Sequence, residues 1–488
     1  MNQMLTRHII NPELIIHQIN WNTNEELLVD YEKFCSMIDY WKILLVEKYQ
    51  AEPGKTILIE FNLLTVYYYS AIFAASELGL IMVIDWPHAY NEYDVHSYRM
   101  TMHGKIDYAI VHSSQLDPNS ELYSYWDVQR NIINCNQLIT EIDFDTYEIK
   151  DHALYKQVAK TIFANPTMPA IWAASSGTTG LPKKIEITHQ EIYLQAQRLS
   201  THSNYQPTDN CLHMRNLHHG ASMCYHFLPS FMVGKDQYLL AYKDQIDEQV
   251  TQTVIDFKIN KILLYTANQV SDYLKLTPPL EHHLDIITLF LCPVETVALL
   301  KEKNVSSLRT MFGDTTIGLG FFVKTVYKDF DKNTYEKNCL GKQLDDFFNL
   351  KIKDGLLYIS CPATGKDWKT SKDRFELRND QYYFFGRSDL YRIKDEWVGL
   401  AEIESKIAEY FGNDGATVAF DTDGIQTKIL LVVWKENSKA EQNLNSYFES
   451  NFKEARINNI ARNLNPAEFT ISRKIDREKI RDYFRRQS

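Results

Sequence analysis

The chain has 488 residues, of which 44% are hydrophobic and 24% charged, with 14 prolines and 18 glycines. This length exceeds one ordinary hydrophobic core, so we expect a large domain and at least one smaller one, and the composition excludes a largely disordered or low-complexity protein. A net charge of −11 gives no sign of a general nucleic-acid-binding protein, because phosphate backbones attract surfaces rich in unopposed Lys and Arg.

The seven cysteines are odd in number and form no CxxC pair, which argues against a disulfide framework or a zinc ribbon and fits a reducing compartment. The N-terminus lacks the features of a signal peptide. The most apolar window, residues 70–86, contains Ser76, Glu77 and Asp85 and is too short to span a bilayer. We therefore expect a cytoplasmic protein without a membrane span, and we interpret residues 70–86 as buried core. The sequence leaves the oligomeric state open.

Short β-rich runs alternate with helical patterns through most of the chain. A helix is predicted near residues 63–78, and strands are predicted to begin near residues 56, 80, 107, 170, 261 and 286. This alternation predicts crossover units and parallel sheets that are buried on both faces. We therefore predict an α/β protein with a large N-terminal domain, residues 1–385, of mostly parallel sheets and covering helices.

The pattern changes after about residue 386. A helix is predicted at 401–410, strands are predicted at "ATVAF" and "KILLVVW", and two highly charged helical stretches follow, separated by "NPAEFTIS". These elements predict a small α+β C-terminal domain, residues 386–488. The boundary falls at "FFGRSDLYRIK", where a polar turn follows an aromatic strand.

The stretch "AASSGTTGLPKKIEITH", residues 173–189, is unusual in a chain with so few glycines. Its loop follows an apolar strand, so it lies at the carboxyl end of a parallel strand, where open α/β sheets bind ligands. Glycines allow successive N–H groups to face one anion, hydroxyls add donors, and Lys183 and Lys184 add positive charge. The loop thus predicts a polyphosphate site without the spacing of a P-loop. Its residues are Ser175, Ser176, Gly177, Thr178, Thr179 and Gly180.

This loop, with Thr188 and His189, resembles the phosphate-loop motif of the adenylate-forming superfamily, which contains acyl- and aryl-CoA synthetases, peptide-synthetase adenylation domains and firefly luciferase. Other segments resemble further motifs of that superfamily in the same order, and together they cover nearly the whole chain. They are "MFGDTT" at 311, "WKTSKDRFEL" at 368, "YYFFGRSDLYRIK" at 382, "EWVGLAEIESKI" at 396 and "FTISRKIDREKIR" at 469.

The resemblance implies roles for individual residues. Lys474 and Lys183 are the expected catalytic lysines, and Asp389 is the expected hinge, near residues 387–390, about which a mobile C-terminal domain swings. Gly313 and His218 are expected in the substrate pocket. The expected nucleotide contacts are the loop residues 175–180 together with Asp314, Thr315, Asp373 and Arg387.

Three of the departures from the family pattern are substitutions at single motif positions. Thr316 stands where a glutamate that helps to hold Mg²⁺ is usual, and Lys372 and Arg473 stand where glycines are usual. Threonine is a weak ligand for this hard cation. The resemblance implies ATP and Mg²⁺ as cofactors, but the metal ligands stay unknown.

The segment 216–234 occupies the place of the acyl-pocket motif. It contains no aspartate to pair with an α-ammonium group, which disfavours an α-amino acid as substrate. The histidines in and beside it suit no usual zinc-ligand spacing, so we expect them to form a pocket wall rather than a metal site. They are His213, His218, His219 and His226.

The resemblance therefore implies an AMP-forming acid–thiol ligase. Such an enzyme activates a small carboxylic acid as acyl-AMP, releases pyrophosphate and passes the acyl group to a thiol. The sequence identifies neither the acid nor the acceptor, which is coenzyme A, the phosphopantetheine of an acyl carrier protein, or an amine. A non-catalytic nucleotide-binding scaffold of the same fold is the alternative suggested by the substituted motif positions.

Overall fold

The computed structural model describes most of the chain in a series of stretches. They are residues 4–20, 25–60, 65–84, 106–111, 132–134, 158, 160–174, 184–214, 217, 222–240, 246–289, 291–314, 318–336, 338–387, 390–393, 396–399, 403, 407, 410–411, 416–422, 427–434, 457–462, 464–471, 474–475 and 477–487.

One sheet is built from the N-terminal part of the chain. Its described strands are β3 (Thr56–Glu60), β4 (Ile81–Ile84), β5 (Tyr108–Val111), β6 (Ile132–Asn134), β7 (Pro169–Ala174) and β8 (Lys184–Thr188). They lie in the order β6–β5–β3–β4–β7–β8, and neighbours run parallel except at β8. The strands predicted near residues 56, 80, 107 and 170 are confirmed.

A second sheet follows the order β14–β13–β12–β11–β9–β10–β1–β2. Its strands are β1 (Ile15–Asn20), β2 (Glu25–Asp30), β9 (Asn210–His213), β10 (Asp236–Leu239), β11 (Lys261–Leu264), β12 (Asp285–Thr288), β13 (Ser307–Asp314) and β14 (Gly318–Tyr327). Its inner strands are parallel, and the edge strands β2 and β14 are antiparallel to their neighbours. The strands predicted near 261 and 286 and the parallel-rich α/β class are confirmed.

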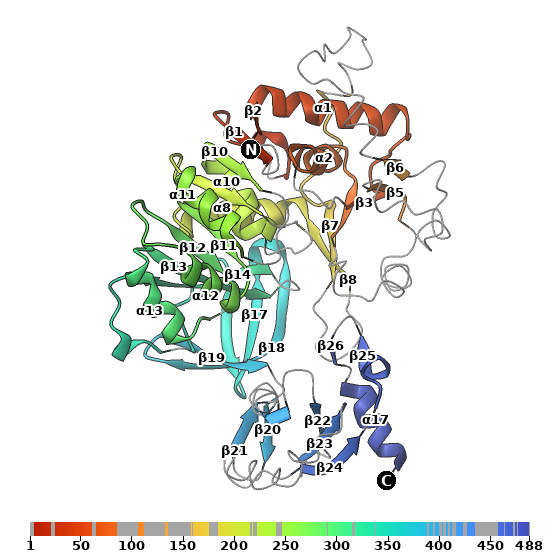
Figure 1. The fold of residues 1–488 in the computed structure, drawn as a ribbon. Coiled ribbons are helices and arrows are strands. Elements are labelled where there is room, and N and C mark those ends of the chain that lie inside the picture. Colours follow the sequence, from red (N-terminus) through yellow and green to blue (C-terminus); the bar gives the residue numbers. More distant parts are fainter. Residues whose placement is uncertain are drawn as a thin grey trace.

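Helices cover these sheets (Figure 1). They are α1 (Tyr31–Glu47), α2 (Val66–Glu77), α8 (His189–His202), η4 (Met223–Phe227), α10 (Leu228–Val233), α11 (Glu248–Asp256), α12 (Ala267–Leu276) and α13 (Val294–Glu302). One apolar core joins both sheets through α1, α2, α8 and α10, and it includes Leu263 of β11. The neighbouring Ile262 and Leu264 enter a second core with α11, α12 and α13, so this sheet is buried on both faces.

Helix α2 is buried around almost its whole circumference because nearly every side chain is apolar or small. Its N-terminus is capped by the Thr65 hydroxyl, which accepts a hydrogen bond from the N–H of Tyr68. Its C-terminus is followed by Gly79, whose φ of +70° is a left-handed conformation that favours glycine. The interpretation of this region as buried core is confirmed for residues 70–84.

A third, antiparallel sheet has the order β15–β19–β18–β17–β16. Its strands are β15 (Cys339–Gly341), β16 (Asn349–Lys353), β17 (Leu356–Cys361), β18 (Lys366–Arg378) and β19 (Gln381–Arg387). Its apolar face packs with Phe321 and Phe322 of β14, so this sheet is joined to the second one.

The C-terminal elements lie at one end of the molecule (Figure 1). They are β20 (Leu390–Ile393), β21 (Glu396–Gly399), β22 (Ala416–Thr422), β23 (Thr427–Val433), β24 (Ile457–Arg462), β25 (Thr470–Ile471), β26 (Lys474–Ile475) and α17 (Arg477–Gln487). Ile480 and Phe484 of α17 pack on Leu430 and Val432 of β23. The predicted α+β character, the two predicted strands and the last helix are confirmed.

One C-terminal prediction is wrong. The end of the first charged stretch, expected to be helical, is the strand β24, which pairs in parallel with β23 and buries Ala461. The charge pattern of these residues is typical of a helix, but pairing with the apolar strand β23 determines their structure. Of the helix predicted at 401–410, residues 403, 407 and 410 are described and are helical, while the rest lies outside the described residues. The boundary at residue 386 stays a prediction.

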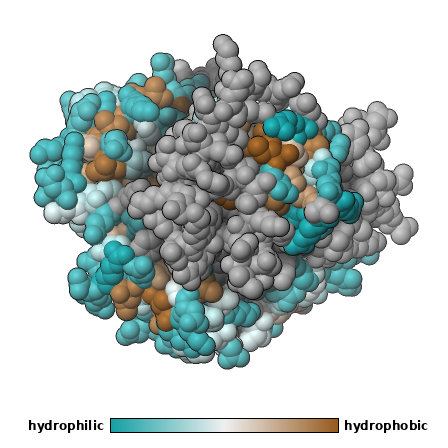
Figure 2. Space-filling model, turned by 90° about the horizontal axis from the view of Figure 1, so that it is seen from below, coloured by the Kyte–Doolittle hydropathy of each residue, from teal (hydrophilic) through white to brown (hydrophobic). Residues whose placement is uncertain are grey.

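The surface carries mostly hydrophilic side chains with apolar ones between them, as Figure 2 shows for one face. Exposed large apolar side chains come from separate elements, among them Tyr327 of β14 and Leu377 of β18, as is usual for protein surfaces. Within the described part of the chain, no helix is long and apolar enough to cross a membrane. The six described cysteines are free thiols.

A buried ionic cluster lies at the C-terminal end of α2. The carboxylate of Glu77 is fully buried and accepts hydrogen bonds from Arg7 at 2.7 and 2.8 Å and from the Lys42 ammonium at 2.9 Å. Burial alone would raise the pKa of Glu77, but the hydrogen bonds and charges of Arg7 and Lys42 outweigh burial and hold that pKa below its ordinary value. The cluster therefore ties the N-terminal segment and α1 to α2.

Glu77→Gln keeps the shape of the side chain but removes the buried negative charge that lies between Arg7 and Lys42, and leaves Asp39 as the remaining carboxylate beside Arg7. We expect a free energy of unfolding lower by about 3–5 kcal/mol at pH 7, measured by urea denaturation. The folded-state pKa of Glu77 lies below its ordinary value of 4.5, so the stabilisation is present above pH 4.5 and is lost as the pH falls through the folded-state pKa. The difference between the two proteins should therefore shrink in acid.

Glu302→Gln is the matched control, because the Glu302 side chain is 65% exposed and its ion pair with Lys303 is on the surface. We expect it to change the stability by less than about 0.5 kcal/mol. Equal effects of the two substitutions would contradict the importance of the buried cluster.

Candidate active site

The phosphate-loop segment joins two strands that lie side by side. Strand β7 runs parallel to β4, and β8 returns antiparallel, so that Ala174 and Lys184 are paired. This places both ends of the segment at the carboxyl end of a parallel strand, as predicted. Residues 175–183, which include all six predicted loop contacts and Lys183, lie outside the described residues.

Lys184 was expected to add positive charge to this loop. Its ammonium lies 3.7 Å from the centre of the Trp172 ring and 3.2 Å from a carboxylate oxygen of Glu186. The described contacts of the Lys184 ammonium are therefore with neighbouring strand residues.

The helix after the loop is fixed to the third sheet. Thr188 caps α8 in a capping box with Glu191, whose carboxylate accepts a hydrogen bond from the Thr188 N–H. The other oxygen of Glu191 lies 2.6 Å from the ammonium of Lys366, the first residue of β18. Asp373, which is predicted to bind the ribose, lies on the same strand as Lys366. The ion pair therefore links this strand to the helix that follows the phosphate loop.

Asp373 and Arg387 lie directly opposite each other in the register of β18 and β19. Asp373 is 3% exposed, and its N–H donates to the Ser371 hydroxyl at 3.1 Å. The strand position of Arg387 is described, but its side chain is not. The structure thus brings together two residues that are 14 positions apart and were both predicted to bind the nucleotide.

Gly313 and Asp314 end strand β13, and Asp314 pairs with Gly318 of β14 across a register shift. The preceding Phe312 packs its ring 5.6 Å from that of Phe375 and 5.0 Å from that of Phe384. These aromatic contacts join the end of β13 to the β18–β19 hairpin, and each is worth about 0.5–1.5 kcal/mol. Thr315 and Thr316 lie outside the described residues, as does the expected hinge Asp389.

Lys474 begins the short strand β26, where its backbone pairs with that of Ile471. Its side chain is not among those described. The structure thus locates the predicted catalytic lysine in the C-terminal elements but gives no contact between its side chain and the other site residues.

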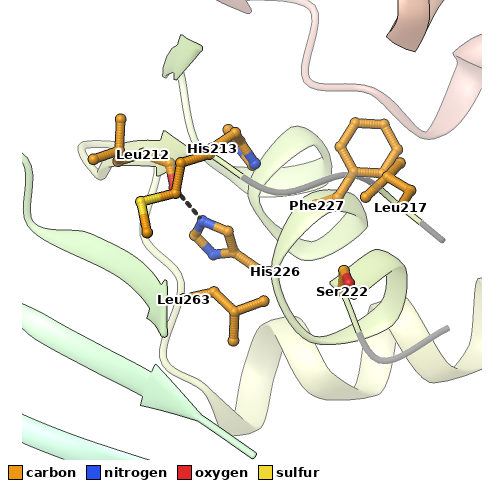
Figure 3. Close-up of a pocket in the computed structure, with 8 residues that line it drawn as sticks. Leu212, His213, Leu217, Ser222, His226, Phe227 and Leu263 are labelled. Atoms are coloured by element: carbon orange, nitrogen blue, oxygen red, sulfur yellow. Dashed lines mark hydrogen bonds between the residues drawn. The ribbon is translucent and has the colours of Figure 1, made fainter. Parts of the chain in front are cut away.

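Described residues of the acyl-pocket segment line a small cavity together with the ends of β9 and β11 (Figure 3). The acyl-pocket segment contains the π-helix η4, which continues directly into α10. His213 and His226 line the cavity with Ser222 and apolar side chains, in agreement with the pocket wall expected for the histidines. His218 and His219 lie outside the described residues.

The hydrogen bonds of the two histidines fix their tautomers. His226 donates from Nε2 to the Leu212 carbonyl at 2.9 Å, so its Nδ1 accepts from the Tyr205 hydroxyl at 2.7 Å. His213 donates from Nε2 to the Gln237 side-chain oxygen at 2.8 Å. Burial lowers the pKa of His213 to about 4 and that of His226 well below its ordinary value, so both rings are neutral.

These histidines are held by protein groups and not arranged as metal ligands. Within the part of the chain that the structure describes, no group of three or more His, Cys, Asp or Glu side chains could hold a metal ion.

Ser222 was not predicted as a site residue. Its hydroxyl is buried, and among the described residues it has no hydrogen-bond partner. Leaving a hydroxyl in this state costs about 1–3 kcal/mol, and such a group is available to a bound ligand. The sequence could not single it out, because the neighbouring segment also contains Ser230, whose hydroxyl donates to the Phe227 carbonyl.

A family model described as AMP-binding enzyme matches residues 67–318, which is more than half of the chain. The match extends from the start of α2 to the start of β14 and includes the phosphate-loop segment, the cavity and the end of β13. None of the curated proteins that were compared matches the sequence.

Solved structures share the fold over nearly the whole chain. O-succinylbenzoate coenzyme A synthetase from Bacillus subtilis, in complex with AMP, is 17% identical with a TM-score of 0.73 and covers 98% of this chain and 97% of its own. McyG A-PCP complexed with phenylalanyl-adenylate is 15% identical with a TM-score of 0.72, covering 97% and 81%. MbtA from Mycobacterium smegmatis, in its apo structure, is 17% identical with a TM-score of 0.62, covering 98% and 94%. This likeness shows the two-domain fold.

The buried histidines predict a pH dependence of stability. A histidine in the unfolded chain takes up a proton near pH 6.5, whereas His213 resists protonation down to about pH 4. The stability that depends on its neutral form is therefore present above pH 6.5 and is lost as the pH falls. Between pH 7.5 and pH 5 this residue should cost the wild type roughly 2 kcal/mol.

His213→Asn cannot be protonated in this range. Urea denaturation at the two pH values should show that the variant loses less stability on acidification than the wild type, by roughly 2 kcal/mol. Equal losses in the two proteins would show that His213 is not held as a neutral ring.

Proposed function

Because the chain belongs to the AMP-binding enzyme family, we propose that it uses ATP to activate an organic carboxylic acid as acyl-AMP, with release of pyrophosphate, and then transfers the acyl group to a thiol. The family match over residues 67–318 carries this proposal. Two relatives of the same fold were solved with AMP and with phenylalanyl-adenylate, ligands that belong to such a reaction. The acceptor is coenzyme A or the phosphopantetheine of an acyl carrier protein.

The nucleotide contacts proposed here follow the order of the motifs. In this proposal the loop residues 175–180 bind the phosphates of the nucleotide, and Asp314 and Thr315 also contact the nucleotide. Asp373 accepts hydrogen bonds from the two ribose hydroxyls, and Arg387, its partner in register, lies beside the same sugar. The burial of Asp373 supports this role because a carboxylate is a stronger acceptor away from bulk water.

A magnesium ion is expected with ATP, and another structure of the Bacillus subtilis synthetase holds ATP and a magnesium ion. Mg²⁺ prefers oxygen ligands and is usually held by one or two carboxylates together with substrate phosphates. The carboxylate of Asp314, at the end of β13, fits this preference. The ion would neutralise phosphate charge during attack by the carboxylate.

Adenylation brings two anions together, so positioning and charge neutralisation must supply most of the rate. Lys183 and Lys474 are proposed to supply positive charge where the acid's carboxylate attacks the α-phosphorus. Lys474 lies in the C-terminal elements, so it reaches the phosphate only when these elements close over the large domain. Movement about Asp389 would then withdraw Lys474 before the acyl group is transferred.

Asp373→Asn tests the ribose contact. The amide has one acceptor oxygen instead of two and no charge, so ATP and AMP should both bind more weakly, by about 10- to 100-fold in calorimetric titration. Asp380→Asn, in the exposed turn of the same hairpin, is the control and should leave both affinities unchanged. Unchanged AMP affinity in Asp373→Asn would remove Asp373 from the site.

Lys474→Ala tests the adenylation step. Its charge is useful chiefly in the transition state, so the rate of acyl-AMP formation should fall by about 10²- to 10³-fold while ATP affinity stays near the wild-type value. A pre-made acyl-adenylate should still react with its acceptor, because Lys474 has moved away by that stage. Single-turnover measurements separate the two steps.

Lys479→Ala is the control for this experiment, since Lys479 is exposed on α17, close to Lys474 in sequence. A normal adenylation rate in Lys474→Ala would contradict the assignment of this lysine and the proposed domain movement with it.

A further inference from the structure

The cavity in the acyl-pocket segment has room for about one water molecule, with a volume of about 10 Å³ (Figure 3). It lies where β9 and β11 end, which is the edge at which α/β sheets bind ligands. Leu217, Phe227 and Leu263 supply apolar walls, and Ser222 lies on the wall formed by the start of the π-helix. This space is too small for a whole organic acid but suits a single oxygen substituent of one.

Ser222 is a polar side chain of this wall that lacks a hydrogen-bond partner among the described residues. Both ring nitrogens of His226 are used, by Tyr205 and by the Leu212 carbonyl, and Nε2 of His213 is used by Gln237. The hydroxyl of Ser222 is buried and has no hydrogen-bond partner within the described residues. A ligand atom that can form a hydrogen bond would satisfy it, whereas a methyl group would leave it unpaired.

The charge of the cavity wall limits which kind of ligand atom can form a hydrogen bond with Ser222. None of the described side chains that line the cavity is an acid, a lysine or an arginine, and burial keeps His213 and His226 neutral. Among these described side chains a charged substituent would have no counter-charge, and burying an unpaired charge is strongly unfavourable. An uncharged oxygen is the chemistry that fits this described lining.

We propose that Ser222 determines which acid is activated, by forming a hydrogen bond with an uncharged hydroxyl or keto oxygen carried by the substrate. This inference rests on the proposed function, because the ligand is the carboxylic acid that is adenylated. Neighbouring contacts hold the wall in place. The Tyr68 hydroxyl accepts a hydrogen bond from the Leu217 N–H at 3.1 Å, and the Tyr69 ring lies 4.7 Å from that of Phe227.

The test compares acids that differ by one oxygen substituent. The probes are benzoate against 2-, 3- and 4-hydroxybenzoate, and butanoate against 3-hydroxybutanoate and 3-oxobutanoate, with kcat/KM for adenylation measured on the full chain. We expect the wild type to prefer the oxygenated member of at least one pair by about 10- to 100-fold. Ser222→Ala should bring that ratio close to one by lowering kcat/KM for the oxygenated acid only.

Ser200→Ala is the matched control, because Ser200 is also buried in a helix but its hydroxyl donates to the Gln197 carbonyl at 2.7 Å. It should keep the wild-type ratio. Ser222→Ala removes no hydrogen bond seen within the described residues, so its Tm should not fall below that of the wild type, and a loss of preference cannot then be attributed to unfolding.

The inference is overturned if the wild type prefers no oxygenated acid, or if Ser222→Ala keeps the ratio or lowers both members equally. Absence of adenylation with every acid would instead contradict the proposed function. In that case the affinities of the same pairs of acids, measured by calorimetric titration, test the role of Ser222 separately. A preference for the oxygenated acid that is lost in Ser222→Ala supports this role, and equal affinities of the two acids for the wild type overturn it.

Discussion

The burial of α2 between the two large sheets is the constraint on which the rest of the structure depends. An almost entirely apolar helix can be buried on all sides, but it ends in Glu77, whose charge requires partners. Arg7 and Lys42 supply them from the N-terminal segment and from α1. Residues at the start of α2 then contact the acyl-pocket segment, through the Tyr68 hydroxyl and the Tyr69 ring. The cavity wall is thus positioned by the same helix that joins the sheets.

A second set of contacts joins parts of the site that are distant in sequence. Phe312 precedes the Gly313–Asp314 end of β13, and its ring packs on Phe375, two residues beyond Asp373. The ion pair of Lys366 with Glu191 connects the start of β18 to the helix after the phosphate loop. The elements that carry Asp314 and Asp373 are therefore fixed to each other and to the helix after the phosphate loop, as precise positioning of a substrate requires.

Strands of the parallel sheets could be predicted because they contain continuous apolar runs such as 262–264, which are buried on both faces. Helix α2 could be predicted because its apolar residues follow a capping threonine. The strand β24 could not, because its charge pattern resembled a helix and only its pairing with β23 decided the outcome. The return of β8 beside β7 and the contact of Lys366 with Glu191 depend on tertiary packing. Ser222 was missed because no sequence signal shows which serine in a helix lacks a partner.

The central claim is that this chain activates a carboxylic acid with ATP, and exchange of labelled pyrophosphate into ATP tests it most directly. The full chain should catalyse this exchange only when a suitable acid from a panel is present, because formation of acyl-AMP must be reversible before pyrophosphate can enter ATP. A chain that binds ATP but shows no exchange with any acid of a broad panel would contradict the account and favour a nucleotide-binding scaffold of the same fold.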